Sequence, residues 1–136
     1  MKKYLLLVGV VISTLTSCGI DDDAQSFYFE ILPIESVELP EEFVFGDTYE
    51  IFIDYIRPSS CYVFNDFLYQ VNDQERTIGI WNTVYTDNAC EQDPETVTVS
   101  FEFNVNNNET YVFKFFQGQD EDGVDQYLII EVPVVE

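Results

Sequence analysis

Carboxylates dominate the side chains that could do chemistry in this chain of 136 residues, which has 26 acidic residues and no histidine. Asp120, Asp122 and Asp125 lie close together around Gly123. Calcium takes about six to eight hard oxygen ligands and suits flexible loops of carboxylates, so this segment predicts a calcium site. The segment lacks the EF-hand order of ligands and the glutamate that ends such a loop. A turn with solvated acids is the alternative interpretation.

The absence of histidine narrows the catalytic chemistry. Ser-His-Asp and Cys-His arrangements and histidine-ligated metal sites all need a residue type that the chain lacks. A glycosidase needs only two carboxylates roughly 5 to 10 Å apart, but among 26 acids such a pair arises by chance. We therefore expect no enzyme, with a carboxylate-based hydrolase as the disfavoured alternative.

Two aromatic residues are candidates for a binding surface. In the expected strand 77–86, Ile78, Ile80 and Val84 share one face, which places Trp81 and Tyr85 on the other. Exposed Trp and Tyr rings stack on sugars and anchor protein interfaces. The alternative is an inverted or bulged register, in which Trp81 is an ordinary core residue.

The first eighteen residues carry the features of an export signal. Two lysines precede an apolar stretch over residues 4–15, which is shorter than the roughly 20 residues of a membrane span. The run Leu15-Thr16-Ser17-Cys18 resembles the cleavage box of bacterial lipoproteins. This resemblance implies that residues 1–17 are removed and that Cys18 carries a lipid anchor to the membrane. An ordinary secretory signal with a coincidental cysteine is the alternative.

The segment after Cys18 is polar and acidic, so residues 18–25 are expected to form a tether ahead of a domain over residues 26–136. Asp21-Asp22-Asp23 resembles the acid-rich stretch that marks surface-exported lipoproteins of the Bacteroidota. The resemblance implies an outer-membrane location, at the cell surface or else on the periplasmic face.

The charge balance excludes one class of partner. After removal of the signal only Arg57, Arg76 and Lys114 remain against 26 acids, a formal charge of −23. Such a field repels phosphate backbones, so no nucleic-acid partner is expected, and it favours cations and basic partners. Acidity that merely keeps a secreted protein dispersed is the alternative interpretation.

Cys61 and Cys90 are the cysteines left for a disulfide in an exported protein. Their midpoint falls near the turn-like segment 72–75, between the expected strands 62–71 and 77–86. A hairpin folded at this turn brings the two cysteines together at its open end. The spacing does not fit a metal or redox pair.

The hydrophobic period of the rest of the chain is two, which predicts an all-β domain. The expected strands cover residues 27–32, 34–39, 49–56, 62–71, 77–86, 96–105, 110–117 and 126–135. Pro33 lies between the first two, which predicts an edge strand that breaks and switches sheets. Strands at this spacing predict an antiparallel, immunoglobulin-like β-sandwich of about seven strands. The cysteine pair joins neighbouring strands and so departs from the immunoglobulin pattern.

Alternating strand directions place loops 57–60, 87–95 and 118–125 at the tether end and loops 40–48, 72–76 and 106–109 at the far end. The acids at 87–95 and 120–125 would then form one cluster. The expected function is a non-catalytic binding or scaffolding module of the cell envelope with an envelope protein or a glycan as its partner. A calcium-stabilised adhesion or carbohydrate-binding module is the main alternative.

Overall fold

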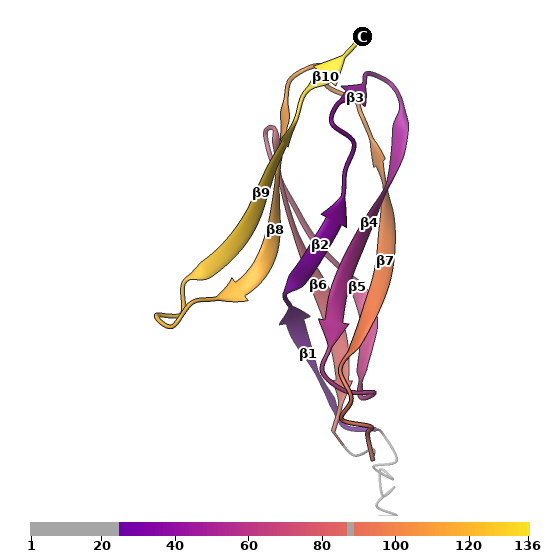
Figure 1. The fold of residues 1–136 in the computed structure, drawn as a ribbon, viewed down its shortest axis with the longest axis vertical. Helices are drawn as coiled ribbons and strands as arrows, with labels where there is room; N and C mark the ends of the chain where they lie inside the picture. The colour runs from indigo at the N-terminus through magenta and orange to yellow at the C-terminus, as the bar shows by residue number, and fades with distance from the viewer. Residues whose placement is uncertain (1–24, 87–88) are drawn as a thin grey trace, which may run out of the picture.

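The computed structural model describes residues 25–86 and 89–136, and all regular elements in these ranges are β-strands (Figure 1). The strands are β1 (Phe27–Leu32), β2 (Ile34–Glu38), β3 (Phe43–Val44), β4 (Thr48–Arg57), β5 (Tyr62–Asn72), β6 (Glu75–Tyr85), β7 (Glu95–Asn104), β8 (Tyr111–Gln119), β9 (Asp125–Val132) and β10 (Val134–Val135). The all-β prediction is confirmed. Cys18, the signal, residues 18–24 of the tether and Asp87 lie outside the described residues. No helix in the described ranges is long and apolar enough to cross a membrane.

Two main sheets pack face to face in a sandwich-like arrangement (Figure 1). The large sheet contains β1, β5, β6, β8 and β9, and the small sheet has the order β2-β4-β7. In the large sheet β5 pairs with one edge of β6, whereas β1 and β8 share the other edge. The two-residue strands β3 and β10 pair in parallel at the far end.

Pro33 marks the point where the chain passes from one sheet to the other. β1 pairs with β6 of the large sheet, and β2, directly after Pro33, pairs with β4 of the small sheet. Since proline has no N–H to donate to a ladder, it terminates β1 without leaving a donor unpaired. The predicted switch of sheets is confirmed.

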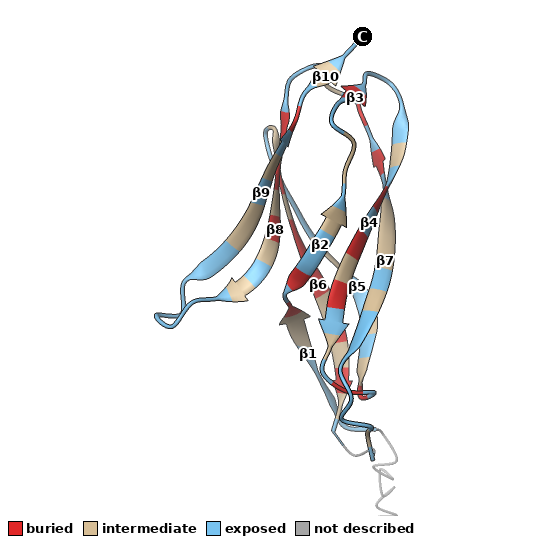
Figure 2. Cartoon of the chain, in the orientation of Figure 1, coloured by how far each residue is buried: buried red, intermediate tan, exposed pale blue. Residues whose placement is uncertain are grey.

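The core lies between the two sheets and follows the period of two most clearly along β4, β6 and β8 (Figure 2). On β6 the side chains of Ile78, Ile80 and Val84 are buried, as their alternation predicts. Aromatic rings fill the centre of the far half, where Phe103, Tyr111 and Phe113 contact one another edge-on or tilted. Burial of these rings, together with the aliphatic side chains around them, stabilises the sandwich.

The last strand ends earlier than expected, and one short strand was not expected. The last strand was expected to run over 126–135, but it ends at Val132, and after Pro133 the chain continues as β10 beside β3. β3 itself was not expected, because two residues carry no periodicity and are held by a partner distant in sequence.

The β8–β9 hairpin leaves the sandwich and projects to one side (Figure 1). β8 pairs with β6 only from Glu75 to Ile78, because β1 occupies the same edge of β6 from Ile80 onward. β8 therefore has no room beside β6 beyond Phe115. The loops after β4 and β6 meet as expected, since Ser60 and Glu91 exchange two hydrogen bonds at 2.9 and 2.8 Å. The tip of the β8–β9 hairpin lies apart from them (Figure 1), so the expectation that loop 118–125 joins this group was wrong.

Candidate binding surface

The outer face of the large sheet carries a cluster of exposed aromatic rings. Phe27 and Phe29 are 54% and 53% exposed, and Trp81 and Tyr85 beside them are half-buried. The ring of Trp81 contacts Phe29 edge-on with centroids 6.0 Å apart, and Tyr85 contacts Phe27 at 6.3 Å. The register of the predicted strand 77–86 is therefore the one that places Trp81 and Tyr85 outside the core.

The strand register explains why these rings gather. β1 and β6 are antiparallel, with Phe27 opposite Tyr85, Phe29 opposite Thr83 and Ile31 opposite Trp81. Opposite residues share a face of the sheet, and diagonal neighbours are within reach of aromatic side chains. Every second residue of β1 thus adds a ring or an apolar group to the face that carries Trp81.

A groove of about 770 Å³ runs between this face and the diverging β8–β9 hairpin. The larger apolar and aromatic side chains that line it are Phe29, Ile31, Leu68, Trp81, Phe116 and Tyr127. Glu30, Gln70 and Thr77 line it from the sheet side as well. Gly79 lies at the centre of the sheet face, where a Cβ atom would stand 3.2 Å from Cγ2 of Ile31 and 3.4 Å from Cβ of Leu68. A side chain at this position would be in tight contact with Ile31, which would have to shift slightly.

Polar groups border the hairpin side of the groove. The amide of Gln119 donates to Oδ1 of Asp125 at 2.8 Å, and the Tyr127 hydroxyl donates to Oδ2 at 3.4 Å. Partial burial and the neighbouring Asp125 carboxylate raise the pKa of Tyr127. The Lys114 ammonium lies 4.7 Å from the centroid of the Tyr127 ring. The groove thus combines aromatic walls with an oriented carboxylate and amide.

The acids proposed for calcium do not all point toward one another. Oδ1 of Asp120 accepts the backbone N–H groups of Asp122 and Val124 at 2.9 and 3.0 Å, and Gly123 has a φ of 76°. Asp120 thus closes its own turn, while Asp125 belongs to the groove. Within the described ranges no group of three or more Asp, Glu, Cys or His side chains is arranged to hold a metal ion. The calcium site remains a prediction.

The two cysteines lie together at the open end of the β5–β6 hairpin, as predicted. Cys61 and Cys90 are at disulfide distance, with Cα atoms 5.5 Å apart. Cys61 precedes β5, its carbonyl accepts the N–H of Tyr85 at 3.1 Å, and Cys90 follows the end of β6. The bond therefore links the two ends of the β5–β6 hairpin that carries Trp81.

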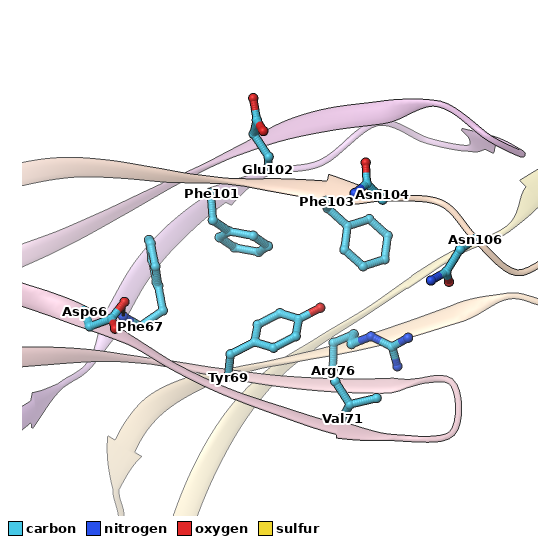
Figure 3. Close-up of a pocket in the computed structure, with 10 residues that line it drawn as sticks. All are labelled: Asp66, Phe67, Tyr69, Val71, Arg76, Phe101, Glu102, Phe103, Asn104 and Asn106. Atoms are coloured by element: carbon cyan, nitrogen blue, oxygen red, sulfur yellow. Dashed lines mark hydrogen bonds between the residues drawn. The ribbon is translucent and has the colours of Figure 1, made fainter.

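A second hollow opens on the side of the sandwich, between β5 and β7 (Figure 3). We call it the lateral slot, and it has a volume of about 610 Å³. Figure 3 shows Phe101 and Phe103 of β7 facing Phe67 and Tyr69 of β5, with Arg76 of β6 beside Tyr69.

Sequence reasoning found Trp81 and Tyr85 but missed the other walls of the groove. The alternation of Phe27, Phe29 and Ile31 was a usable signal, because it matches that of a strand with one aromatic face. Phe116 and Tyr127 gave no such signal, because their proximity to Trp81 depends on the divergence of the β8–β9 hairpin.

We compared the chain with known protein families, curated proteins and solved structures. The chain matches no protein-family model, no curated protein and no solved structure.

Proposed function

We propose that this protein is a lipid-anchored, non-catalytic binding module of the bacterial cell envelope and that it binds a neutral glycan in the groove beside Trp81. The observation that carries the proposal is the pairing of aromatic walls with the oriented polar groups of Gln119 and Asp125. The lipid on Cys18 would keep the domain at the membrane through residues 18–25.

Sugars present both kinds of surface that the groove offers. Their C–H faces pack on aromatic rings, and their hydroxyls exchange hydrogen bonds with carboxylates and amides. The groove volume lies within the range of about 300 to 1,000 Å³ that is usual for small-molecule sites. A formal charge of −23 on the mature chain disfavours acidic glycans.

The only tryptophan of the chain provides a direct test. Residues 18–136 with Cys18→Ser would be titrated with neutral gluco- and manno-oligosaccharides and with dextran sulfate, while Trp81 fluorescence is recorded. We expect a saturable change with at least one neutral series and none with dextran sulfate.

Variants then locate the binding. Phe29→Ala removes a groove wall and should weaken binding about tenfold, a change of about 1.4 kcal/mol, as measured by calorimetry. Phe52→Ala is the matched control, because Phe52 is 39% exposed on the outer face of the small sheet. Equal losses in the two variants, or no response to any neutral glycan, would contradict the proposal.

A further inference from the structure

Two long edge strands border the lateral slot. In the described part of the chain, β5 pairs only with β6 and β7 pairs only with β4. Each strand therefore presents one row of unpaired backbone N–H and C=O groups. Both edges lie on the same side of the sandwich (Figure 1), and the slot opens between them.

The core is left uncovered along this side. Tyr69 and Val71 lie on the inner face of the large sheet, opposite Ile78 and Arg76 of β6. Ile78 and Arg76 are 0% and 9% exposed, whereas Tyr69 and Val71 are 41% and 60% exposed. Inner-face side chains become accessible at β5 because no further strand follows it.

Aromatic rings close one end of the lateral slot, and the Arg76 side chain that lines it is held in place by hydrogen bonds. The Phe101 ring lies 5.2 Å from that of Phe67 and 5.8 Å from that of Tyr69, so these rings close the end toward the tether. Arg76 donates to the carbonyls of Asp73 and Glu75 at 2.7 and 3.0 Å. Its guanidinium carbon is also 5.1 Å from the Tyr111 ring centroid. The Arg76 guanidinium thus already has hydrogen-bond and ring partners within the domain.

The edge of β5 has little protection against strand addition. Proteins usually block an exposed edge with lysines, prolines, bulges or very short strands. β5 is 11 residues long, and Asp66 is its one charged residue. Its bulge lies between Phe64 and Asp66, which leaves the half from Phe67 to Asn72 in regular register.

We propose that an extended, basic segment of a partner protein adds as a strand to β5 and inserts its apolar side chains into the lateral slot. The unpaired backbone row requires an extended segment, and the exposed Tyr69 and Val71 require apolar residues at alternate positions. Asp66 lies at the edge of the slot, Glu102 lies beside it with its side chain directed away from the rings (Figure 3), and the domain is strongly acidic, so the residues between should be basic. This inference is independent of the glycan groove.

Charge also decides against a second copy as the occupant. Two chains of formal charge −23 repel each other, and pairing β5 with another β5 supplies no basic group. Addition of a basic segment should weaken as salt rises, whereas self-association of the acidic chain should strengthen.

A ten-residue peptide that alternates lysine and valine, blocked at both ends, is the probe. Its control is a peptide of the same composition with all lysines at one end. Binding to residues 18–136 carrying Cys18→Ser would be followed by fluorescence polarisation and amide hydrogen exchange. We expect the alternating peptide to bind at least about tenfold more tightly than the control and to protect amides between Phe67 and Asn72.

Variants test the position of the added strand. Val71→Lys places a cation in the slot and should weaken peptide binding about tenfold. Ile129→Lys is the matched control, because Ile129 of edge strand β9 is 59% exposed, close to the 60% of Val71. It should leave binding unchanged.

Three outcomes would overturn the inference. Equal binding of the two peptides would mean attraction by charge alone. Protection of β9 rather than β5 would place the strand elsewhere. A dimer that forms without peptide, strengthens with salt and is lost in Val71→Lys would identify a second copy as the occupant.

Discussion

The outer faces of the two sheets differ in what their side chains contact. On the small sheet, polar side chains bond across the strands: Asp54 accepts from Ser36 and Thr98 at 3.2 and 2.5 Å, and Ser100 donates to Glu50 at 2.8 Å. Thr48 and Asn104 form a further pair on this face. On the large sheet, the corresponding positions carry Phe27, Phe29, Ile31, Leu68 and Trp81.

The same period of two therefore produces a solvated face and an aromatic face. Cross-strand polar pairs on the small sheet satisfy one another and water, and the large side chains exposed between them are Phe52 and Ile56, at 39% and 41%. Exposed rings gain free energy only when something covers them. The comparison directs the search for a ligand to the large sheet.

The disulfide should give the largest measurable difference between the sheets. Cys61→Ser with Cys90→Ser opens a crosslink of sequence separation 29 and should lower the free energy of unfolding by about 3 to 4 kcal/mol. Urea denaturation measures the loss. Amide exchange should rise first in β5 and β6 and not in the β4–β7 pair. A loss below about 1 kcal/mol would show that the crosslink adds little to the hairpin.

Tyr55 links the two sheets, because its hydroxyl on β4 bonds to Oδ1 of buried Asn82 on β6 at 3.3 Å. Tyr55→Phe leaves this acceptor unpaired and should cost about 1 to 2 kcal/mol at neutral pH. Burial raises the pKa of Tyr55 above 10.0, with smaller opposing effects of Asn82 and Arg57. Chemical denaturation at a series of pH values checks both effects.

The sign of the pH dependence follows from that raised pKa. The neutral phenol stabilises the fold fully below pH 10, and this contribution is lost as pH rises through the pKa of the folded state. The difference between wild type and Tyr55→Phe should therefore narrow in alkaline solution. A difference that widens would exclude burial of the neutral hydroxyl as the cause.

Asp54→Ala tests the solvated face. It removes two side-chain hydrogen bonds at the surface and should cost about 1 kcal/mol of unfolding free energy. Calorimetry should find glycan binding unchanged. Loss of glycan binding in this variant would assign the ligand to the small sheet and reverse the comparison.

Phe27→Ser should have the smallest effect on stability, within about 0.5 kcal/mol, because the ring is 54% exposed. It should nevertheless reduce the fluorescence of a bound neutral, apolar dye such as Nile red. Ile56→Ser on the small sheet, 41% exposed, is the control and should leave dye binding unchanged. Equal dye loss in both variants would make the two faces equivalent.

Most strands and the hairpin disulfide could be predicted from the sequence, because both depend on local patterns. The alternation around Trp81 identified its face, and the turn at 72–75 placed the cysteines together. The groove could not be predicted, since it depends on which strand occupies each part of one edge of β6. β1 and β8 divide that edge, and this division forces Phe116 and Tyr127 away from the sandwich.

The pairing of β1 with β6 also determines how the domain would bear a mechanical load. If Cys18 is anchored, a pull on the bound ligand is transmitted to the membrane through Phe27, the first residue of β1. The force then acts along the antiparallel ladder from Phe27–Tyr85 to Leu32–Ile80. Hydrogen bonds loaded in this direction are sheared together rather than opened one at a time. The strand nearest the tether would therefore serve as the load-bearing attachment of the domain.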